Sequence, residues 1–150
     1  MTGIKTFLIS ALFILPVQAQ TGQPLLTGVQ RSYYADGQVE MEQEYKEGKM
    51  DGFVREYYPN GKLAFLQGMT DGKINGDVRA YFEDGTLKGE THYVNNYQDG
   101  ISKEYYPTGL VKEEVAYIDG QMMDLKQFDE QGHLVFHQTG KFGYGCAVVK

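Results

Sequence analysis

The feature that most constrains the fold of this chain is a repeat of 24 residues. Four glycines, each closing a phrase that opens with an aromatic residue, stand 24 positions apart: Gly37, Gly61, Gly85 and Gly109. A weaker fifth phrase, from Phe128 to Gly132, comes one residue early. Two more series of turn residues keep the period: Gly48, Gly72, Asn96 and Gly120, then Gly52, Gly76, Gly100 and Asp124. Three series in register predict a linear array of about five similar units.

Each phrase has the composition of a β-hairpin turn. In Pro59-Asn60-Gly61, proline presets φ, asparagine hydrogen-bonds its own backbone, and glycine takes a positive φ without a Cβ clash. Such a three-residue loop predicts an aromatic residue opposite an aliphatic one in every copy: Tyr57 with Leu63, Tyr33 with Val39, Tyr81 with Leu87, Tyr105 with Val111 and Phe128 with Leu134. The register of the second turn stays open, because a two-residue turn and a bulged turn bring opposite faces of the next strand to the same side.

Two strands per repeat predict an all-β fold, an elongated antiparallel meander of about five tandem β-hairpins. A β-propeller is the alternative, but its blades need about four strands in roughly 40 to 50 residues, about twice this period. Glycine, asparagine and aspartate interrupt the chain every few residues, which argues against helices.

The first 19 residues have the pattern of a cleaved signal peptide. Lys5 provides a positive charge, an apolar run follows from Phe7 to Leu15, and Val17-Gln18-Ala19 suits cleavage, so we expect the mature chain to begin at Gln20. The apolar run is too short to span a hydrocarbon layer of about 30 Å. We therefore expect an exported protein, periplasmic or extracellular, without an integral membrane segment. The expected organisation is a signal peptide at 1–19, a lead-in at 20–28, a repeat domain at 29–140 and a C-terminal tail or edge strand at 141–150.

Charge and motif content narrow the classes of function. Removal of residues 1–19 moves the formal net charge from −6 to −7, which disfavours nucleic acid as a partner. The single cysteine, Cys146, cannot form an intramolecular disulfide. His133 and His137, expected on one strand face, are too far apart to chelate one ion, and no common catalytic or phosphate-binding motif occurs. We expect no metal, no cofactor and no enzymatic activity, with an enzyme of unknown class as the alternative.

A row of cations is the one candidate binding feature. Six residues before each turn glycine stands a basic residue: Arg31, Arg55, Arg79, Lys103 and, in the weak copy, Lys126. Parity predicts that they share a face with Tyr33, Tyr57, Tyr81 and Tyr105, and that some have Met41, Phe65 or Phe136 as cross-strand neighbours. The opposite face is expected to carry Glu56, Ala80 and Glu104 together with Val54, Val78 and Leu66. Two interpretations remain: the basic side chains cover apolar surface, or the stripe receives an acidic or sugar-like partner.

The phrase from Tyr57 to Leu63, followed after a strand by Asp71-Gly-Lys-Ile-Asn-Gly76, resembles the MORN-repeat variant of bacterial proteins, and the match runs from Val29 to about Gly140. The resemblance implies stacked hairpins and a role in protein or envelope interactions. Bacterial members are often labelled antitoxin-like. The leading prediction is an exported, non-enzymatic module that binds another protein or serves as a scaffold. The alternatives are an envelope polysaccharide-binding module and an antitoxin or immunity-type partner of a toxin.

Overall fold

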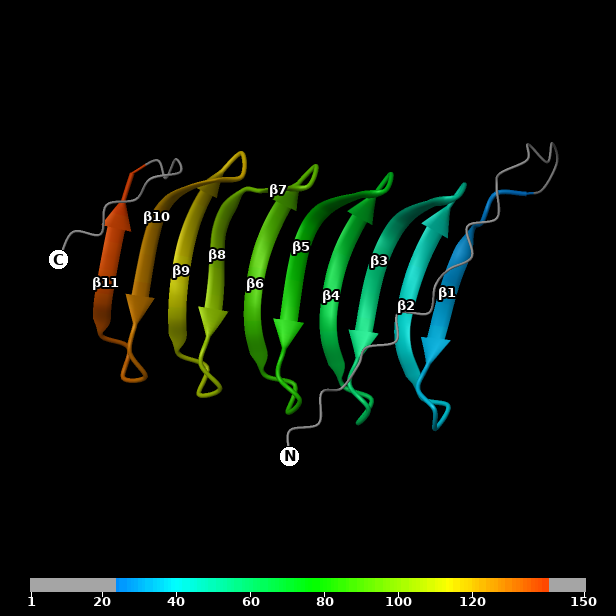
Figure 1. Ribbon diagram of the computed structural model, residues 1–150, viewed down its shortest axis with the longest axis horizontal. Coiled ribbons are helices and arrows are strands. Elements are labelled where there is room, and N and C mark those ends of the chain that lie inside the picture. The colour runs from blue at the N-terminus through cyan, green and yellow to red at the C-terminus, as the bar shows by residue number, and fades with distance from the viewer. Residues whose placement is uncertain (1–23, 141–150) are drawn as a thin grey trace, which may run out of the picture.

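The structure is a computed structural model that describes residues 24–140. These residues form one open antiparallel sheet, a single layer in which the strands follow one another in sequence order (Figure 1). The predicted all-β meander is confirmed. Within the described range there is no helix, and so none long and apolar enough to cross a membrane. The predicted signal peptide at 1–19 and the predicted tail at 141–150, with Cys146, lie outside the described residues.

The sheet contains ten strands in its main path, in the order β1 (Gly28–Tyr33), β2 (Val39–Lys46), β3 (Lys49–Tyr57), β4 (Leu63–Thr70), β5 (Lys73–Tyr81), β6 (Leu87–Val94), β8 (Gly100–Tyr105), β9 (Val111–Ile118), β10 (Gln121–Phe128) and β11 (Leu134–Thr139). A short strand, β7 (Tyr97–Gln98), pairs with β6 just before β8 does. The main path thus holds two strands for each of the predicted repeats.

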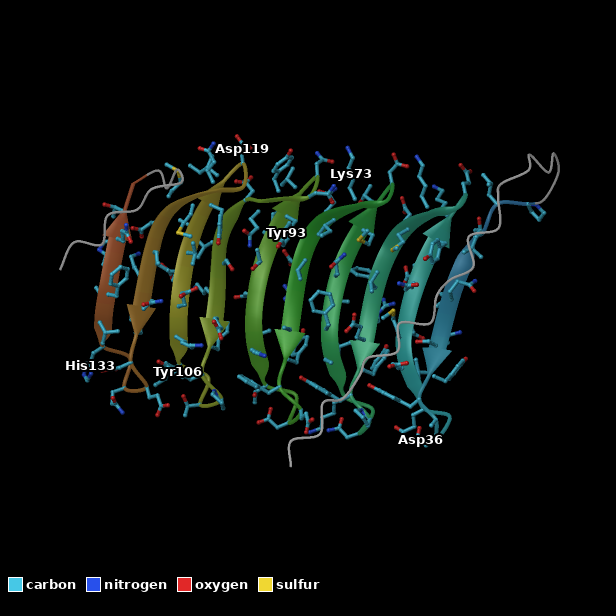
Figure 2. The ribbon with its side chains drawn as sticks, in the orientation of Figure 1. Asp36, Lys73, Tyr93, Tyr106, Asp119 and His133 are labelled. Carbon is cyan, nitrogen blue, oxygen red and sulfur yellow. The ribbon has the colours of Figure 1, made fainter. Side chains whose placement is uncertain are left out.

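The glycine phrases form the hairpin turns at one end of the strands, where Figure 2 places Asp36, Tyr106 and His133. In the second copy the Gly61 N–H donates to the Tyr58 carbonyl, and the Tyr58 N–H donates to the Lys62 carbonyl, both over 2.8 Å. All five predicted aromatic and aliphatic pairs are present in the predicted register. The three-residue turn is therefore confirmed.

Replacement of the turn glycine tests this assignment. Gly61 has a φ of 78°, where a β-branched side chain is strained, so Gly61→Val should lower the free energy of unfolding by about 1–2 kcal/mol. Lys62→Ala is the control, because the exposed Lys62 side chain makes one hydrogen bond, to the Asp84 carbonyl. Denaturant midpoints measure both variants. Equal midpoints would contradict the turn.

The second turn of each repeat lies at the opposite end of the strands and has two central residues. In the second repeat these are Asp71 and Gly72, with φ values of 52° and 78°, which is the pattern of a type I′ hairpin. The matching pairs also have positive φ at both positions: Glu47 with Gly48, Asn95 with Asn96, and Asp119 with Gly120. The register that the sequence left open is thus a two-residue turn.

An irregular bulge, with three residues opposite one, follows each of the first two of these turns. In β4 and β5, Met69 pairs with Ile74 and Gln67 pairs with Val78, so Gly68 faces the three residues from Asn75 to Asp77. The bulge between β2 and β3 has the same form and lies opposite Glu44. The glycine series at Gly52 and Gly76 therefore marks bulges, and the φ of Gly76 is 97°.

Hydrogen bonds one period apart join successive repeats. At the end of the strands that carries the type I′ turns, the Gly72 N–H donates to the Met50 carbonyl, and the Asn96 N–H donates to the Ile74 carbonyl. At the end that carries the glycine phrases, the Tyr58 hydroxyl donates to the Tyr81 carbonyl over 2.7 Å. Tyr34 and Tyr106 make the equivalent bonds to the next repeat. Each hairpin is held mainly by its neighbours, as expected for a linear repeat array.

A single layer leaves little buried surface. Among the described residues, the buried hydrophobic side chains are Val54, Met69 and Val115. Successive side chains of a strand point to opposite faces, and each of these three residues is next in its strand to a residue on the face that carries the cations. All three therefore point to the opposite face. That opposite face holds the better packed apolar side chains, and the cation face is the more polar one.

Candidate functional site

The predicted cations form a line that runs across the strands. Cross-strand pairing places an acidic or apolar residue between successive cations. From β1 to β11 the line contains Arg31, Glu42, Arg55, Leu66, Arg79, Glu90, Lys103, Glu114, Lys126 and His137. We call these ten residues the charge ladder and the side of the sheet that they occupy the ladder face.

The neighbours of the cations differ from those that the sequence predicted. Tyr57 pairs with Leu63, but Glu56 pairs with Phe65, so Ala64 is an extra residue in a bulge. This bulge shifts the register by one residue and brings Leu66, not Phe65, beside Arg55. The prediction that Leu66 lies on the opposite face is wrong for the same reason.

The equivalent bulge occurs at both ends of the sheet. Met41 pairs with Ser32, and Glu42 takes the predicted place of Met41 beside Arg31. Phe136 pairs with Gln127, and His137 lies beside Lys126. The predicted apolar neighbours Met41, Phe65 and Phe136 therefore lie on the face opposite the cations.

The ladder alternates in charge because glutamates stand between most of the cations. The Arg31 Nε lies 2.7 Å from the Glu42 Oε1, and the Arg55 Nη1 lies 2.6 Å from the Glu44 Oε1 and 3.9 Å from the Glu42 Oε2. The hydrogen bond from Arg31 is the largest influence that lowers the pKa of Glu42. This stretch of the ladder is an ion-pair network, not a positively charged stripe.

The second half of the ladder is paired in the same way. The Arg79 Nη2 lies 2.8 Å from the Asp77 Oδ2, and its Nε lies 3.8 Å from the Glu90 Oε2. Glu114 forms ion pairs on both sides, at 3.8 Å from the Lys103 Nζ and at 3.2 Å from the Lys126 Nζ, which also donates a hydrogen bond to it. These side chains are partly exposed, so each pair alone contributes about 0–1 kcal/mol to stability.

The predicted tyrosines share this face and adjoin the ladder. The Tyr57 hydroxyl donates to the Glu42 carboxylate over 3.1 Å, and the Tyr105 hydroxyl donates to Glu90 over 2.8 Å. Burial, and secondarily the bond to Glu90, raises the pKa of Tyr105 to about 12. Tyr81 is half-buried, and Tyr33 is exposed on the first strand. The structure thus brings the predicted aromatic and basic residues together.

One break in the ladder was not predicted from the sequence. Leu66 stands where three of the other four repeats carry a glutamate, namely Glu42, Glu90 and Glu114. Two positions later, Gly68 stands where the other repeats have Glu44, His92 and Ala116. Both positions lie on the ladder face, and an open hollow of about 590 Å³ lies over them. The sequence signal for the hollow is a double departure from the repeat.

The hollow has an aromatic wall and a polar wall. Phe53 is 44% exposed, and the Arg55 guanidinium lies 5.0 Å from the centroid of its ring. On the other side, the Asp77 carboxylate lies 2.8 Å from the His92 Nδ1 and 2.8 Å from Arg79. The hydrogen bond with His92 is the largest influence that lowers the pKa of Asp77.

In the described part of the chain, no group of three or more His, Cys, Asp or Glu side chains is placed to hold a metal ion. Each histidine instead contacts an aspartate of its own: His92 with Asp77, His133 with Asp129, and His137 with Asp124. The sequence predicted that His133 and His137 share a strand face. This prediction is wrong, because His133 lies in the loop before β11.

Comparison with known proteins gives one family match. A family model described as "MORN repeat variant" matches residues 26–47, 50–67, 74–95 and 98–119. No curated protein matches the chain. Among solved structures, the chain is similar to a mutant of S. aureus TarM in complex with Fondaparinux, alpha-GlcNAc-glycerol and UDP, at 10% sequence identity and a TM-score of 0.41. The similarity covers 67% of this chain and 20% of the other, so the chain spans about a fifth of that protein.

Proposed function

The chain belongs to the MORN repeat variant family, and from this membership we propose that it is an exported, non-enzymatic repeat protein that binds another protein through the ladder face. One observation carries the proposal: a row of ion pairs and a row of tyrosines run side by side across the sheet, and both are partly exposed. Export is supported by the signal-like pattern of residues 1–19.

The chemistry of the ladder face suits a protein surface. Tyrosine and arginine supply much of the energy of protein interfaces, since they combine apolar area with directional hydrogen bonds. A ladder of alternating charge is best matched by a surface that also alternates in charge, which disfavours a uniformly acidic partner. The face is an extended, open layer, whereas enzymes gather their reactive groups in an enclosed cleft.

The affinity of a double variant tests the proposal. The protein would first be used to retrieve a partner from an envelope extract, and the affinity for that partner would then be measured. Arg55→Met with Arg79→Met should weaken binding at least about tenfold, or about 1.4 kcal/mol, mainly by faster dissociation. Methionine keeps an apolar stem of similar length, so packing over the sheet is retained.

The matched control is Lys112→Met. Lys112 forms a similarly close ion pair, 2.9 Å from Glu104, and Glu104 lies on the face opposite the ladder. This control should bind like the wild type. If the double variant also keeps wild-type affinity, the ladder only covers apolar surface, and the partner binds elsewhere.

A further inference from the structure

The hollow in the second repeat points to a ligand of a different class. We propose that the hollow over Leu66 and Gly68 is a subsite for one neutral sugar ring of a glycan. Three features carry this inference: the space left open by the two departures from the repeat, the exposed aromatic ring of Phe53, and a polar wall that holds both hydrogen-bond donors and acceptors. A sugar bound there does not depend on the protein partner proposed above.

The open space follows from the absence of one side chain. In the first repeat the Glu44 side chain lies directly over Gly52, where an added Cβ would clash with it. The second repeat has Gly68 in place of Glu44, and a Cβ added at Gly76 would meet no atom within 4 Å. The resulting hollow of about 590 Å³ is within the usual size of small-molecule sites, roughly 300–1,000 Å³.

The wall opposite Phe53 offers both hydrogen-bond donors and acceptors. Asp77 presents carboxylate oxygens there, and Arg79 and His92 present nitrogen groups, while Asp51 adds a carboxylate from β3, the strand that holds Phe53. The lining carries both signs of charge, Asp51 and Asp77 against Arg79, and the adjoining Arg55 beside Phe53 is itself paired with Glu44. A carboxylate ligand would meet two aspartates, and an ammonium ligand would meet two arginines. A neutral ligand avoids both repulsions.

A sugar ring fits this lining better than an apolar side chain does. The C–H face of a pyranose is apolar and can stack on the exposed ring of Phe53, while its hydroxyls both donate and accept hydrogen bonds. An apolar side chain would instead remove water from Asp77, Arg79 and His92 without replacing its hydrogen bonds, which is unfavourable.

The test is a titration of the purified protein with neutral hexasaccharides of glucose, N-acetylglucosamine, mannose and galactose, followed by NMR to about 10 mM ligand. At least one should give saturable shifts centred on the amides of Phe53, Gly68 and His92. Leu66→Glu, which restores the residue of the other repeats between Arg55 and Arg79, should weaken that binding at least about tenfold. Phe53→Ala should do the same through loss of the stacking surface.

The control is Ile118→Glu, an equally drastic change at an exposed position of β9 far along the sheet, and it should leave the affinity unchanged. No shift at these amides with any of the four glycans would overturn the proposal, and so would unchanged affinity in both Leu66→Glu and Phe53→Ala. Stronger binding of an oligogalacturonate than of the neutral glycans would also overturn it. Shifts with N-acetyl-tyrosinamide alone would make the hollow an anchor pocket for a protein side chain.

Discussion

Gly68→Ala should lower the free energy of unfolding by about 1–3 kcal/mol, although it adds a single methyl group. Gly68 is buried in β4, opposite the bulge of β5, and a Cβ there would lie 2.5 Å from the Asn75 carbonyl oxygen. The Asn75 backbone belongs to the bulge itself, so it can move away only if the bulge is distorted. The Gly68 backbone does not have a positive φ, so the loss would come from the contact and not from dihedral strain.

Gly89→Ala is the matched control for this variant. Gly89 also lies within a strand without a positive φ, but a Cβ there would be 3.2 Å from the Lys103 carbonyl oxygen. A movement of a few tenths of an ångström relieves that contact, so the loss of stability should be clearly smaller. Urea unfolding of the two variants, followed by circular dichroism, makes the comparison. Equal midpoints would mean that the bulge does not press on Gly68.

The parts of the fold that the sequence predicts are those set by local turn chemistry. Pro59-Asn60-Gly61 defines a turn type, and the turn type determines that Tyr57 faces Leu63. Because the same chemistry recurs every 24 residues, the strand number and the meander order follow from it. No long-range information is needed at this level, since every strand in the main path pairs with its neighbour in sequence.

The face of each residue beyond the turn could not be predicted, because one bulge leaves no mark in the sequence. Ala64 is the extra residue, and its φ is not positive, so no glycine is required there. A shift of one residue moves a side chain to the other face of a strand. The predicted register therefore placed Met41, and not Glu42, beside Arg31, and the alternation of charge along the ladder was not predicted.

The hollow required both the repeat and the register. Aligned repeats show at once that Leu66 replaces a glutamate and that Gly68 replaces Glu44, His92 or Ala116. Only the register shows that these two positions share the ladder face and lie between Phe53 and Asp77. Substitutions within a repeat thus become informative about a site once the pairing of the strands is known.

The largest expected effect comes from deletions that respect or break the period. Deletion of residues 73–96 removes one full period and joins Gly72 to Tyr97, the counterpart of Lys73. β7 and β8 would then take the place of β5 beside β4, and Gly100, with its positive φ, would replace Gly76 in the bulge. Because each hairpin contacts mainly its neighbours, the shortened array should still fold and unfold cooperatively. Its m-value should fall by roughly a fifth, in proportion to the surface that is lost.

Deletion of residues 73–84 is the control, since it removes half a period and a single strand, β5. β6 would follow the turn at Gly72 after only Gly85 and Thr86. Its own turn residues, Asn95 and Asn96, would then fall at the ends of the strands where the glycine phrases lie. Every later turn and ion pair would be out of line with the first repeats, so cooperative unfolding should be lost. Circular dichroism and urea denaturation separate the two outcomes. A folded half-period deletion, or an unfolded full-period deletion, would show that the repeat of two strands is not the unit from which this sheet is built.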